Sequence, residues 1–374
     1  MTDTSTPGGV VDSGAPEWFP HSRSATWHHA TPSKETREFH RSLPSYSITP
    51  LVDLPTLAAE LNVGRVVAKD ESMRLGLPAF KALGASWAID RALRERGGAA
   101  TDQVTIVTAT DGNHGRAVAH FARALGQRAL IFIPDGVHSD AVQAIRDEGA
   151  DVRVVGGSYD FAVASAAQAA DAPDAILVQD TAWPGYEEIP GWIVEGYTTL
   201  FAEADEQLSS LDCGGVDLAV IPTGVGSLLQ AALAYYRSSG DTRVVSVEPH
   251  AAACIAPSLA AGEAVTVSTG TTVLSGLNCG TPSMLAWPLI RDGLHGAASI
   301  DDESAVRAAW DLADLGIAAG PCGGSGLAAA RRLLGGTGAD ERRCWLGINE
   351  SSTVLIIVTE GSGANPLPDR ESLS

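Results

Sequence analysis

The sequence is poor in cysteine and has no cysteine pattern typical of a metal site or a redox pair. Its five cysteines are scattered along 374 residues, at Cys213, Cys254, Cys279, Cys322 and Cys344. Neither a CxxC pair nor the Cys and His spacing of a zinc site occurs. We therefore expect no bound metal and reduced thiols, as in the cytoplasm, most of them buried as small apolar side chains.

Basic residues are also scarce, which limits the partners of the protein. The chain has 25 Lys and Arg against 45 Asp and Glu, a formal net charge of −20 at pH 7. This surplus disfavours binding to nucleic-acid phosphate or to an anionic membrane. No stretch is long and apolar enough to span a membrane, and the N-terminus lacks the basic-then-apolar pattern of a secretory signal. We expect a cytoplasmic protein that binds a small molecule, with no nucleic-acid or membrane partner.

The N-terminal region has little hydrophobic periodicity. Residues 1–16 are rich in Thr, Ser, Gly and Pro, a composition that predicts a disordered tail. A polar stretch follows with three histidines, His28, His29 and His40. Because a metal site needs further ligands at fixed spacing, we expect these histidines to lie on the surface.

Strands and amphipathic helices alternate through the middle of the chain. The hydrophobic pattern predicts strands at 105–108, 129–133, 151–155 and 175–179, with helices at 115–125, 139–148 and 159–170 between them. A short helix at 54–61, a strand at 65–69 and a helix at 80–96 are predicted before them. A second series has predicted strands at 218–222, 243–249 and 354–358, with helices at 228–237, 301–315 and 326–334. Such alternation is typical of α/β proteins with doubly wound parallel sheets.

The two series predict two α/β domains. We assign residues 17–84 and 206–374 to a large domain, and residues 85–205 to a small domain inserted in it. Ligands of open parallel sheets bind beyond the carboxyl ends of the strands. Four residues directly follow predicted strands and can converge there: Asp111, Asp180, Gly224 and Thr359.

Lys81 lies in the first turn of a predicted helix, where its charge is unfavourable. Helix N-termini favour negative charge, so a lysine there is better suited to act as a neutral amine nucleophile. An ordinary solvated lysine is the alternative explanation. Two further motifs, around Asn113 and Gly224, favour the nucleophile.

A glycine-rich turn, Gly224-Val225-Gly226-Ser227, lies between a predicted strand and helix. Backbone N–H groups at such a helix start make an anion site, and the Ser227 hydroxyl can donate another hydrogen bond to a phosphate. The loop matches neither the Walker motif nor the GxGxxG dinucleotide fingerprint. On its own it could equally be a plain turn.

A second glycine turn, Asp111-Gly112-Asn113-His114-Gly115, offers an amide to a flat ligand. Asn113 can donate to or accept from a ring substituent, and its flanking glycines leave space beside it. The alternative is a helix start capped by Asp111, although a cap does not need the glycines. A phosphate loop, a nucleophilic lysine and this turn together describe a pyridoxal phosphate site.

The chain resembles the fold type II pyridoxal-phosphate enzymes, and among them the diaminopropionate ammonia-lyases. The resemblance runs from about residue 39 to residue 366. Its motifs are Phe39-His40-Arg41-Ser42, Thr49-Pro50-Leu51, Lys69-Asp70-Glu71-Ser72, Ala79-Phe80-Lys81-Ala82-Leu83-Gly84, Ala109-Thr110-Asp111-Gly112-Asn113-His114-Gly115, Gln179-Asp180-Thr181-Ala182-Trp183, Gly276-Leu277-Asn278-Cys279-Gly280 and Thr359-Glu360-Gly361. It implies two parallel-sheet domains with pyridoxal 5'-phosphate in the cleft between them, in a homodimer.

The resemblance also implies a role for each site residue. Lys81 would bind the cofactor covalently and act as the base at the substrate's α-carbon. Asp111 would face Lys81 across the cofactor and take the α-proton of the other enantiomer. Asp180 would hold the β-ammonium of the substrate and help it to leave protonated. Thr359 would place its hydroxyl at the pyridine nitrogen.

The activity implied is β-elimination of ammonia from 2,3-diaminopropionate, giving pyruvate and ammonia through 2-aminoacrylate. Two alternatives stay open: dehydration of a β-hydroxy amino acid, and β-replacement that makes a non-proteinogenic amino acid. A cationic β-substituent suits Asp180 better than a hydroxyl does. A non-catalytic protein that retains the fold would have no use for Lys81, Asn113 and the 224–227 loop together.

Overall fold

The computed structural model describes residues 16–22, 33–97, 103–110, 112–157, 159–211 and 214–370. Three of the sequence-based expectations therefore fall largely outside the described residues. They concern the tail at 1–16, of which only Pro16 is described, the two histidines His28 and His29, and the proposed base Asp111.

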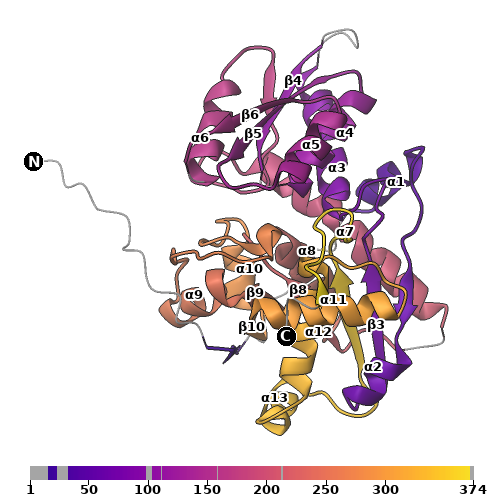
Figure 1. The fold of residues 1–374 in the computed structure, drawn as a ribbon. Coiled ribbons are helices and arrows are strands. Elements are labelled where there is room, and N and C mark those ends of the chain that lie inside the picture. The colour runs from indigo at the N-terminus through magenta and orange to yellow at the C-terminus, as the bar shows by residue number, and fades with distance from the viewer. Residues whose placement is uncertain are drawn as a thin grey trace, which may run out of the picture.

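The larger of two sheets has seven strands, and its five inner strands run parallel (Figure 1). In sheet order the strands are β1 (Trp18–Pro20), β10 (Gly296–Ile300), β9 (Arg243–Pro249), β8 (Leu218–Pro222), β11 (Thr353–Val358), β3 (Arg65–Asp70) and β2 (Leu51–Asp53). The edge strands β1 and β2 pair antiparallel with their neighbours. All seven strands come from the two segments predicted to form the large domain.

Helices cover both faces of this sheet, which makes a three-layer structure. Leu355 and Ile357 of β11 pack in one core with α3 (Lys81–Arg96), α7 (Glu188–Ser209) and α8 (Ser227–Ser239). Val354, Ile356 and Val358 pack in a second core with α11 (Asp302–Asp314) and α12 (Pro321–Leu334). Because both faces are covered, β11 is an unbroken apolar run with no polar alternation. The other helices of this domain are α1 (Glu35–Ser42), α2 (Pro55–Glu60), α9 (Ile255–Ala261), α10 (Trp287–Gly293) and α13 (Ala339–Leu346).

The smaller sheet is fully parallel and forms the other lobe in Figure 1. Its strand order is β6 (Asp151–Val155), β5 (Arg128–Pro134), β4 (Thr105–Ala109) and β7 (Ala175–Leu177). The helices α4 (Asn113–Ala124), α5 (Ser139–Asp147) and α6 (Tyr159–Ala169) connect these strands. The doubly wound α/β class predicted from the sequence is confirmed.

Several elements and the placement of His40 differ from the sequence analysis. The elements not predicted include the strands β1, β2 and β10 and the helices α7, α9, α10 and α13. Helix α7 was not predicted, because it is buried on several sides and lacks a clear polar stripe. Strand β10 was not predicted, because its sequence Gly-Ala-Ala-Ser-Ile has low strand propensity. His40 is fully buried, where a surface histidine was expected. Of the four described cysteines, Cys254 and Cys322 are buried, Cys279 is half-buried and Cys344 is exposed.

The described helices include none with the length and apolar character that crossing a membrane requires.

Candidate active site

Lys81, Asn113 and the 224–227 loop lie at helix starts, whereas Asp180 and Thr359 follow strands, and direct contacts join several of these segments. Lys81 is the first residue of α3, and Asn113 is the first residue of α4. The Phe80 N–H donates to the Thr359 carbonyl across 3.1 Å, which ties the start of α3 to the end of β11. The Ser227 hydroxyl donates to the backbone oxygen of Asp180 at 2.9 Å. Residues from both lobes therefore meet in one site. Asp111 lies outside the described residues, so its predicted role is untested.

The centre of the site is an ion pair between Lys81 and Asp180. The Lys81 Nζ donates to Asp180 Oδ2 at 2.6 Å, and the side chains are 19% and 9% exposed. Burial by itself would raise the pKa of the Asp180 carboxyl, but the Lys81 ammonium outweighs burial and lowers it to about 2. The carboxylate is therefore ionised at neutral pH and binds a primary ammonium.

Aromatic faces complete the surroundings of this ammonium. The Lys81 Nζ lies 5.4 Å from the ring centroid of Phe80 and 5.9 Å from that of Tyr197. Both distances fall in the range of cation–π attraction. Phe80 and Tyr197 also pack together, with ring centroids 4.7 Å apart. One carboxylate and two aromatic faces make this position favourable for a cation.

His114 borders the same position, and its role was not predicted. Its Nε2 bonds the Val178 carbonyl at 2.8 Å, and its Nδ1 lies 4.0 Å from Asp180 Oδ2. A carbonyl only accepts, so Nε2 carries the proton and Nδ1 presents a lone pair. Burial lowers the pKa of this imidazole, which keeps it neutral.

Gln179 fixes the orientation of the Asp180 carboxylate. Its Oε1 accepts from the Thr108 hydroxyl and the Ala109 N–H, both at 2.9 Å. The opposite end of the amide, Nε2, therefore points to Asp180 Oδ1 at 3.3 Å. Gln179 belongs to a motif that the sequence analysis recognised, but its role required the partners on β4.

The loop from Gly224 to Ser227 has the shape of an anion site. Gly226 has φ +97°, a conformation that glycine adopts without strain. A Cβ on Gly224 would lie 3.0 Å from the Gly276 carbonyl oxygen and 3.2 Å from Cys279 Sγ, so a side chain there would force these neighbours to move. Within the described ranges, none of the four backbone N–H groups of this loop donates a hydrogen bond. The Ser227 hydroxyl donates to the backbone oxygen of Asp180, so its proton is engaged there in this structure.

Asn113 is paired with a carboxyl group that the sequence analysis did not assign. The Asn113 Nδ2 donates to Glu360 Oε2 at 2.6 Å. Glu360 is buried, and burial raises the pKa of its carboxyl despite hydrogen bonds from Cys322 and Asn113. Next to it, the buried Thr359 Oγ1 has no hydrogen-bond partner among the described residues. A hydroxyl in this state is suited to meet a ligand atom.

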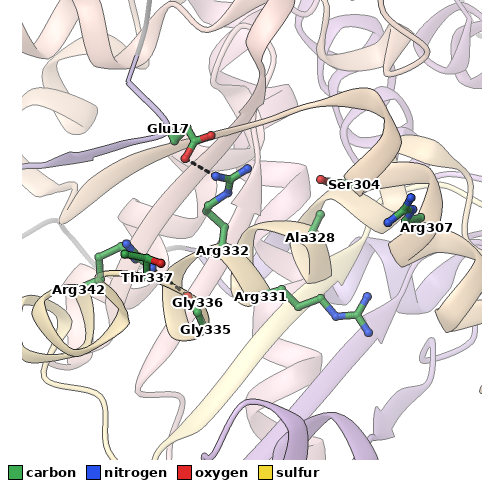
Figure 2. Close-up of a pocket in the computed structure, with 10 residues that line it drawn as sticks. All are labelled: Glu17, Ser304, Arg307, Ala328, Arg331, Arg332, Gly335, Gly336, Thr337 and Arg342. Atoms are coloured by element: carbon green, nitrogen blue, oxygen red, sulfur yellow. Dashed lines mark hydrogen bonds and ion pairs between the residues drawn. The ribbon is translucent and has the colours of Figure 1, made fainter.

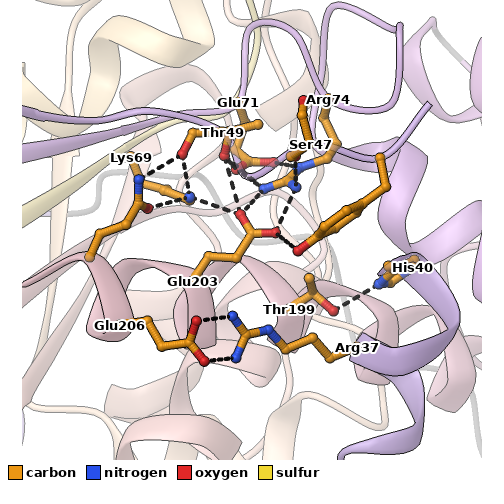
Figure 3. A network of polar contacts seen from close by, with 12 residues as sticks. Arg37, His40, Ser47, Thr49, Lys69, Glu71, Arg74, Thr199, Glu203 and Glu206 are labelled. Carbon is orange, nitrogen blue, oxygen red and sulfur yellow. Dashed lines mark hydrogen bonds and ion pairs between the residues drawn. The ribbon is translucent and has the colours of Figure 1, made fainter. Parts of the chain in front are cut away.

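A buried charge cluster anchors the segment that leads to Lys81 (Figure 3). Arg74 Nη2 lies 2.6 Å from Glu71 Oε1 and 2.7 Å from Glu203 Oε2, and Lys69 Nζ lies 2.9 Å from the latter oxygen. Burial opposes ionisation of Glu203, but Arg74 and Lys69 lower its carboxyl pKa to about 2. The cluster has two cations and two anions, so its net charge is zero and the attraction between the opposite charges offsets the cost of burying them. The cluster ties β3 and the 71–80 segment to α7.

A cavity of about 570 Å³ lies elsewhere, beside α11 and α12 (Figure 2). It contains none of the residues above. Three of its arginines are in ion pairs: Arg332 with Glu17, Arg307 with Glu303, and Arg331 with Glu60. The fourth, Arg342, donates to the carbonyls of Leu333 and Gly335. This cavity is therefore not a candidate catalytic site.

Comparison with known proteins gives a consistent result. The family described as pyridoxal-phosphate dependent enzyme matches residues 43–360. A diaminopropionate ammonia-lyase of Salmonella typhimurium is 34% identical over 356 residues, which cover 87% of this chain and 88% of that protein.

Two solved structures of the Escherichia coli diaminopropionate ammonia-lyase share the fold. One is a complex with an aminoacrylate-PLP azomethine reaction intermediate, at TM-score 0.82 and 32% identity, and the match covers 92% of this chain and 96% of that one. The other is a complex with D-serine, at TM-score 0.84 and 32% identity, and it covers 92% and 94% of the two chains.

Proposed function

The chain belongs to the pyridoxal-phosphate-dependent enzymes, and on this premise we propose that it removes ammonia from 2,3-diaminopropionate. The overall reaction consumes water and yields pyruvate and two molecules of ammonia. One observation carries the choice of substrate: Asp180 holds a primary ammonium at 2.6 Å in a position bordered by Phe80 and Tyr197.

The residues present fit the cofactor. The uncommitted N–H groups of the 224–227 loop, at the start of α8, suit the phosphate. The unpartnered Thr359 hydroxyl suits the pyridine nitrogen, and the Asn113 amide suits a ring substituent. Lys81 is the residue that would hold the cofactor covalently. It pairs with Asp180, which accepts from Ser227, and its neighbour Phe80 donates to the Thr359 carbonyl.

The chemistry divides between the cofactor and the chain. When bound, pyridoxal phosphate supplies an electron sink for negative charge at the substrate α-carbon. Lys81 takes the α-proton of one enantiomer, and Asp111 is proposed to take it from the other. Asp180 holds the β-amino group as an ammonium, so that it leaves as neutral ammonia when the C–N bond breaks and the bonding electrons stay on nitrogen.

The ion pair explains why an amine is preferred to a hydroxyl. In this structure the Lys81 ammonium stands for the substrate's β-ammonium at Asp180. If Lys81 is committed to the cofactor, another cation must balance the buried carboxylate, because leaving it unpaired is costly. Diaminopropionate supplies that cation, whereas serine supplies only a neutral hydroxyl.

An assay of the purified holoenzyme tests the proposal. Ammonia and pyruvate are measured with L- and D-diaminopropionate, serine, threonine and 3-hydroxyaspartate, each at equal concentration. The proposal predicts the highest kcat/KM with diaminopropionate. A higher kcat/KM with a β-hydroxy amino acid would instead identify a dehydratase, and consumption of substrate without pyruvate would favour β-replacement.

We also propose a cytoplasmic homodimer. The family resemblance supports the dimer, and the scattered cysteines, none of the described ones in a disulfide, support a reducing compartment. Two exposed apolar side chains, Ile48 and Met73, lie on adjoining segments, since Arg74 Nη1 donates to the Ser47 carbonyl at 3.3 Å. They offer a surface that a second copy could cover. Analytical ultracentrifugation would give the mass, and a monomer at micromolar concentration would rule the dimer out.

A further inference from the structure

We propose that His114 is a second acceptor for the β-ammonium of the substrate, so that Asp180 and His114 together select an amine over a hydroxyl. This inference rests on the proposed function and deepens it by naming a specificity-determining residue. His114 contributes the lone pair of Nδ1, and Asp180 contributes Oδ2. The two atoms lie 4.0 Å apart at the position that the Lys81 ammonium borders.

The hydrogen bonds of the imidazole fix which nitrogen is available. Nε2 donates to the Val178 carbonyl at 2.8 Å, which assigns the single proton of the neutral ring to Nε2. Nδ1 has no hydrogen-bond partner among the described residues, although the side chain is only 4% exposed. An acceptor that is buried and unmatched costs free energy until a donor reaches it. The substrate is the donor that this site is built to receive.

The separation of the two acceptors suits one shared ammonium. An ammonium that donates along two tetrahedral N–H directions, at about 2.9 Å each, places its acceptors roughly 4.7 Å apart. Bending each bond by about 10° reduces that separation to the observed distance, which hydrogen bonds tolerate. The two atoms are therefore placed to bind different hydrogens of the same nitrogen.

The number of hydrogens provides the discrimination. An ammonium has three and can serve Asp180 Oδ2 and His114 Nδ1 at the same time. A hydroxyl has one, so a β-hydroxy amino acid leaves one buried acceptor unmatched. Sites with unmatched buried polar groups reject an analogue much more strongly than sites that differ only in shape. Charge and donor count thus act in the same direction.

Two substitutions separate the acceptor from the structural role of the ring. The amide of asparagine lies at the distance of Nδ1 from the backbone, so His114→Asn keeps an acceptor there but loses the bond to Val178. The amide of glutamine reaches the distance of Nε2, so His114→Gln keeps a donor for the Val178 carbonyl but removes the acceptor. A purely structural histidine would be replaced better by glutamine. A histidine that accepts from substrate would be replaced better by asparagine.

The first test measures kcat/KM of each holoenzyme for L-diaminopropionate and for L-serine, together with Tm. We expect His114→Gln to lower the preference for diaminopropionate over serine about 10- to 100-fold while Tm stays near that of the parent. We expect His114→Asn to keep the preference within about threefold and to lower Tm. An unchanged preference in His114→Gln, or an equal loss in both variants, would overturn the proposal.

The second test does not depend on the substrate, so it separates this inference from the proposed function. Methylammonium chloride is titrated into Lys81→Ala protein with and without each His114 substitution, and the rise in Tm is recorded. Methylammonium should stabilise Lys81→Ala and its His114→Asn double variant, and stabilise the His114→Gln double variant much less. Equal stabilisation of all three would refute the two-acceptor site. A parent enzyme inactive on diaminopropionate would refute the proposed function, and the methylammonium result would still decide on the site.

Discussion

Replacing Asp180 by asparagine removes one negative charge from a buried ion pair while keeping the shape of the side chain. Asp180 Oδ2 lies 2.6 Å from the Lys81 ammonium, and its side chain is 9% exposed. Removing one partner of a buried, hydrogen-bonded charge pair costs about 2–4 kcal/mol, which corresponds to roughly 30- to 1000-fold in rate. We expect kcat/KM for L- and D-diaminopropionate to fall by this factor, since both enantiomers present the same β-ammonium.

Serine serves as the internal control for this variant. A hydrogen bond from its hydroxyl is worth about 1.5–3 kcal/mol to a carboxylate and about 0.5–1.5 kcal/mol to the amide oxygen of asparagine. Asp180→Asn should therefore lower its kcat/KM by only about 10-fold. Any change in Lys81 caused by the loss of its partner affects both substrates alike and cancels in the ratio. The assay is steady-state pyruvate formation by the holoenzyme at pH 8. An equal loss for serine and diaminopropionate would refute the role of Asp180 in binding the amine.

Four other substitutions test other parts of the site. Lys81→Ala should abolish trapping of the cofactor by borohydride and lower turnover to near background. A trapped adduct on another lysine would show that this other residue binds the cofactor. Gly226→Asp should weaken cofactor binding far more than Gly226→Ala, with affinity measured by equilibrium dialysis. Both substitutions carry the strain of φ +97°, but only aspartate places a negative charge near the phosphate. Equal cofactor affinity in the two variants would show that the phosphate binds elsewhere. Asp111→Asn should abolish turnover of D-diaminopropionate and spare most L activity, since an amide cannot accept the proton, and equal loss of both enantiomers would reduce Asp111 to a helix cap. Glu203→Gln should lower the free energy of unfolding in urea by about 3–5 kcal/mol, because two buried cations lose a partner. The matched control Glu206→Gln changes an ion pair whose glutamate is half-exposed, and it should lower that free energy by less than about 1 kcal/mol. Similar losses in the two variants would contradict the burial of Glu203.

The low pKa of Asp180 has a consequence for stability in acid. Its pKa in the folded protein, about 2, lies below the ordinary value of 3.8. The pair therefore stabilises the fold fully above the unfolded pKa, and this contribution is lost as pH falls from about 4 through about 2. In cofactor-free protein, where Lys81 is an ammonium, Asp180→Asn should flatten the dependence of the unfolding free energy on pH in that window, as measured by urea unfolding.

The sequence analysis predicted where the candidate site residues lie in the fold, because they follow simple rules for strand ends and helix starts. Lys81, Asn113 and the 224–227 loop stand at helix starts, where glycine and anion-binding patterns are visible in the sequence itself. Their convergence followed from the carboxyl-end rule for parallel sheets. These local signals do not depend on which distant residues meet them.

The partners of these residues could not be predicted, because they depend on contacts across the fold. Glu360 contacts Asn113 from 247 positions away, and nothing local marks it as the partner of an amide. The charge cluster of Lys69, Arg74 and Glu203 requires α7, a helix that the hydrophobic pattern did not reveal. For the same reason His40 was expected on the surface, whereas it is buried and its Nε2 bonds the Leu83 carbonyl at 3.0 Å.

The ratio of products from L-diaminopropionate tests the central claim most directly. Purified holoenzyme is incubated with the substrate, and ammonia and pyruvate are measured in the same samples over time. Elimination of the β-amino group followed by hydrolysis predicts two ammonia for each pyruvate, at a rate proportional to enzyme and abolished in Lys81→Ala. Loss of substrate with one ammonia and no pyruvate, or pyruvate from serine but none from diaminopropionate, would contradict it.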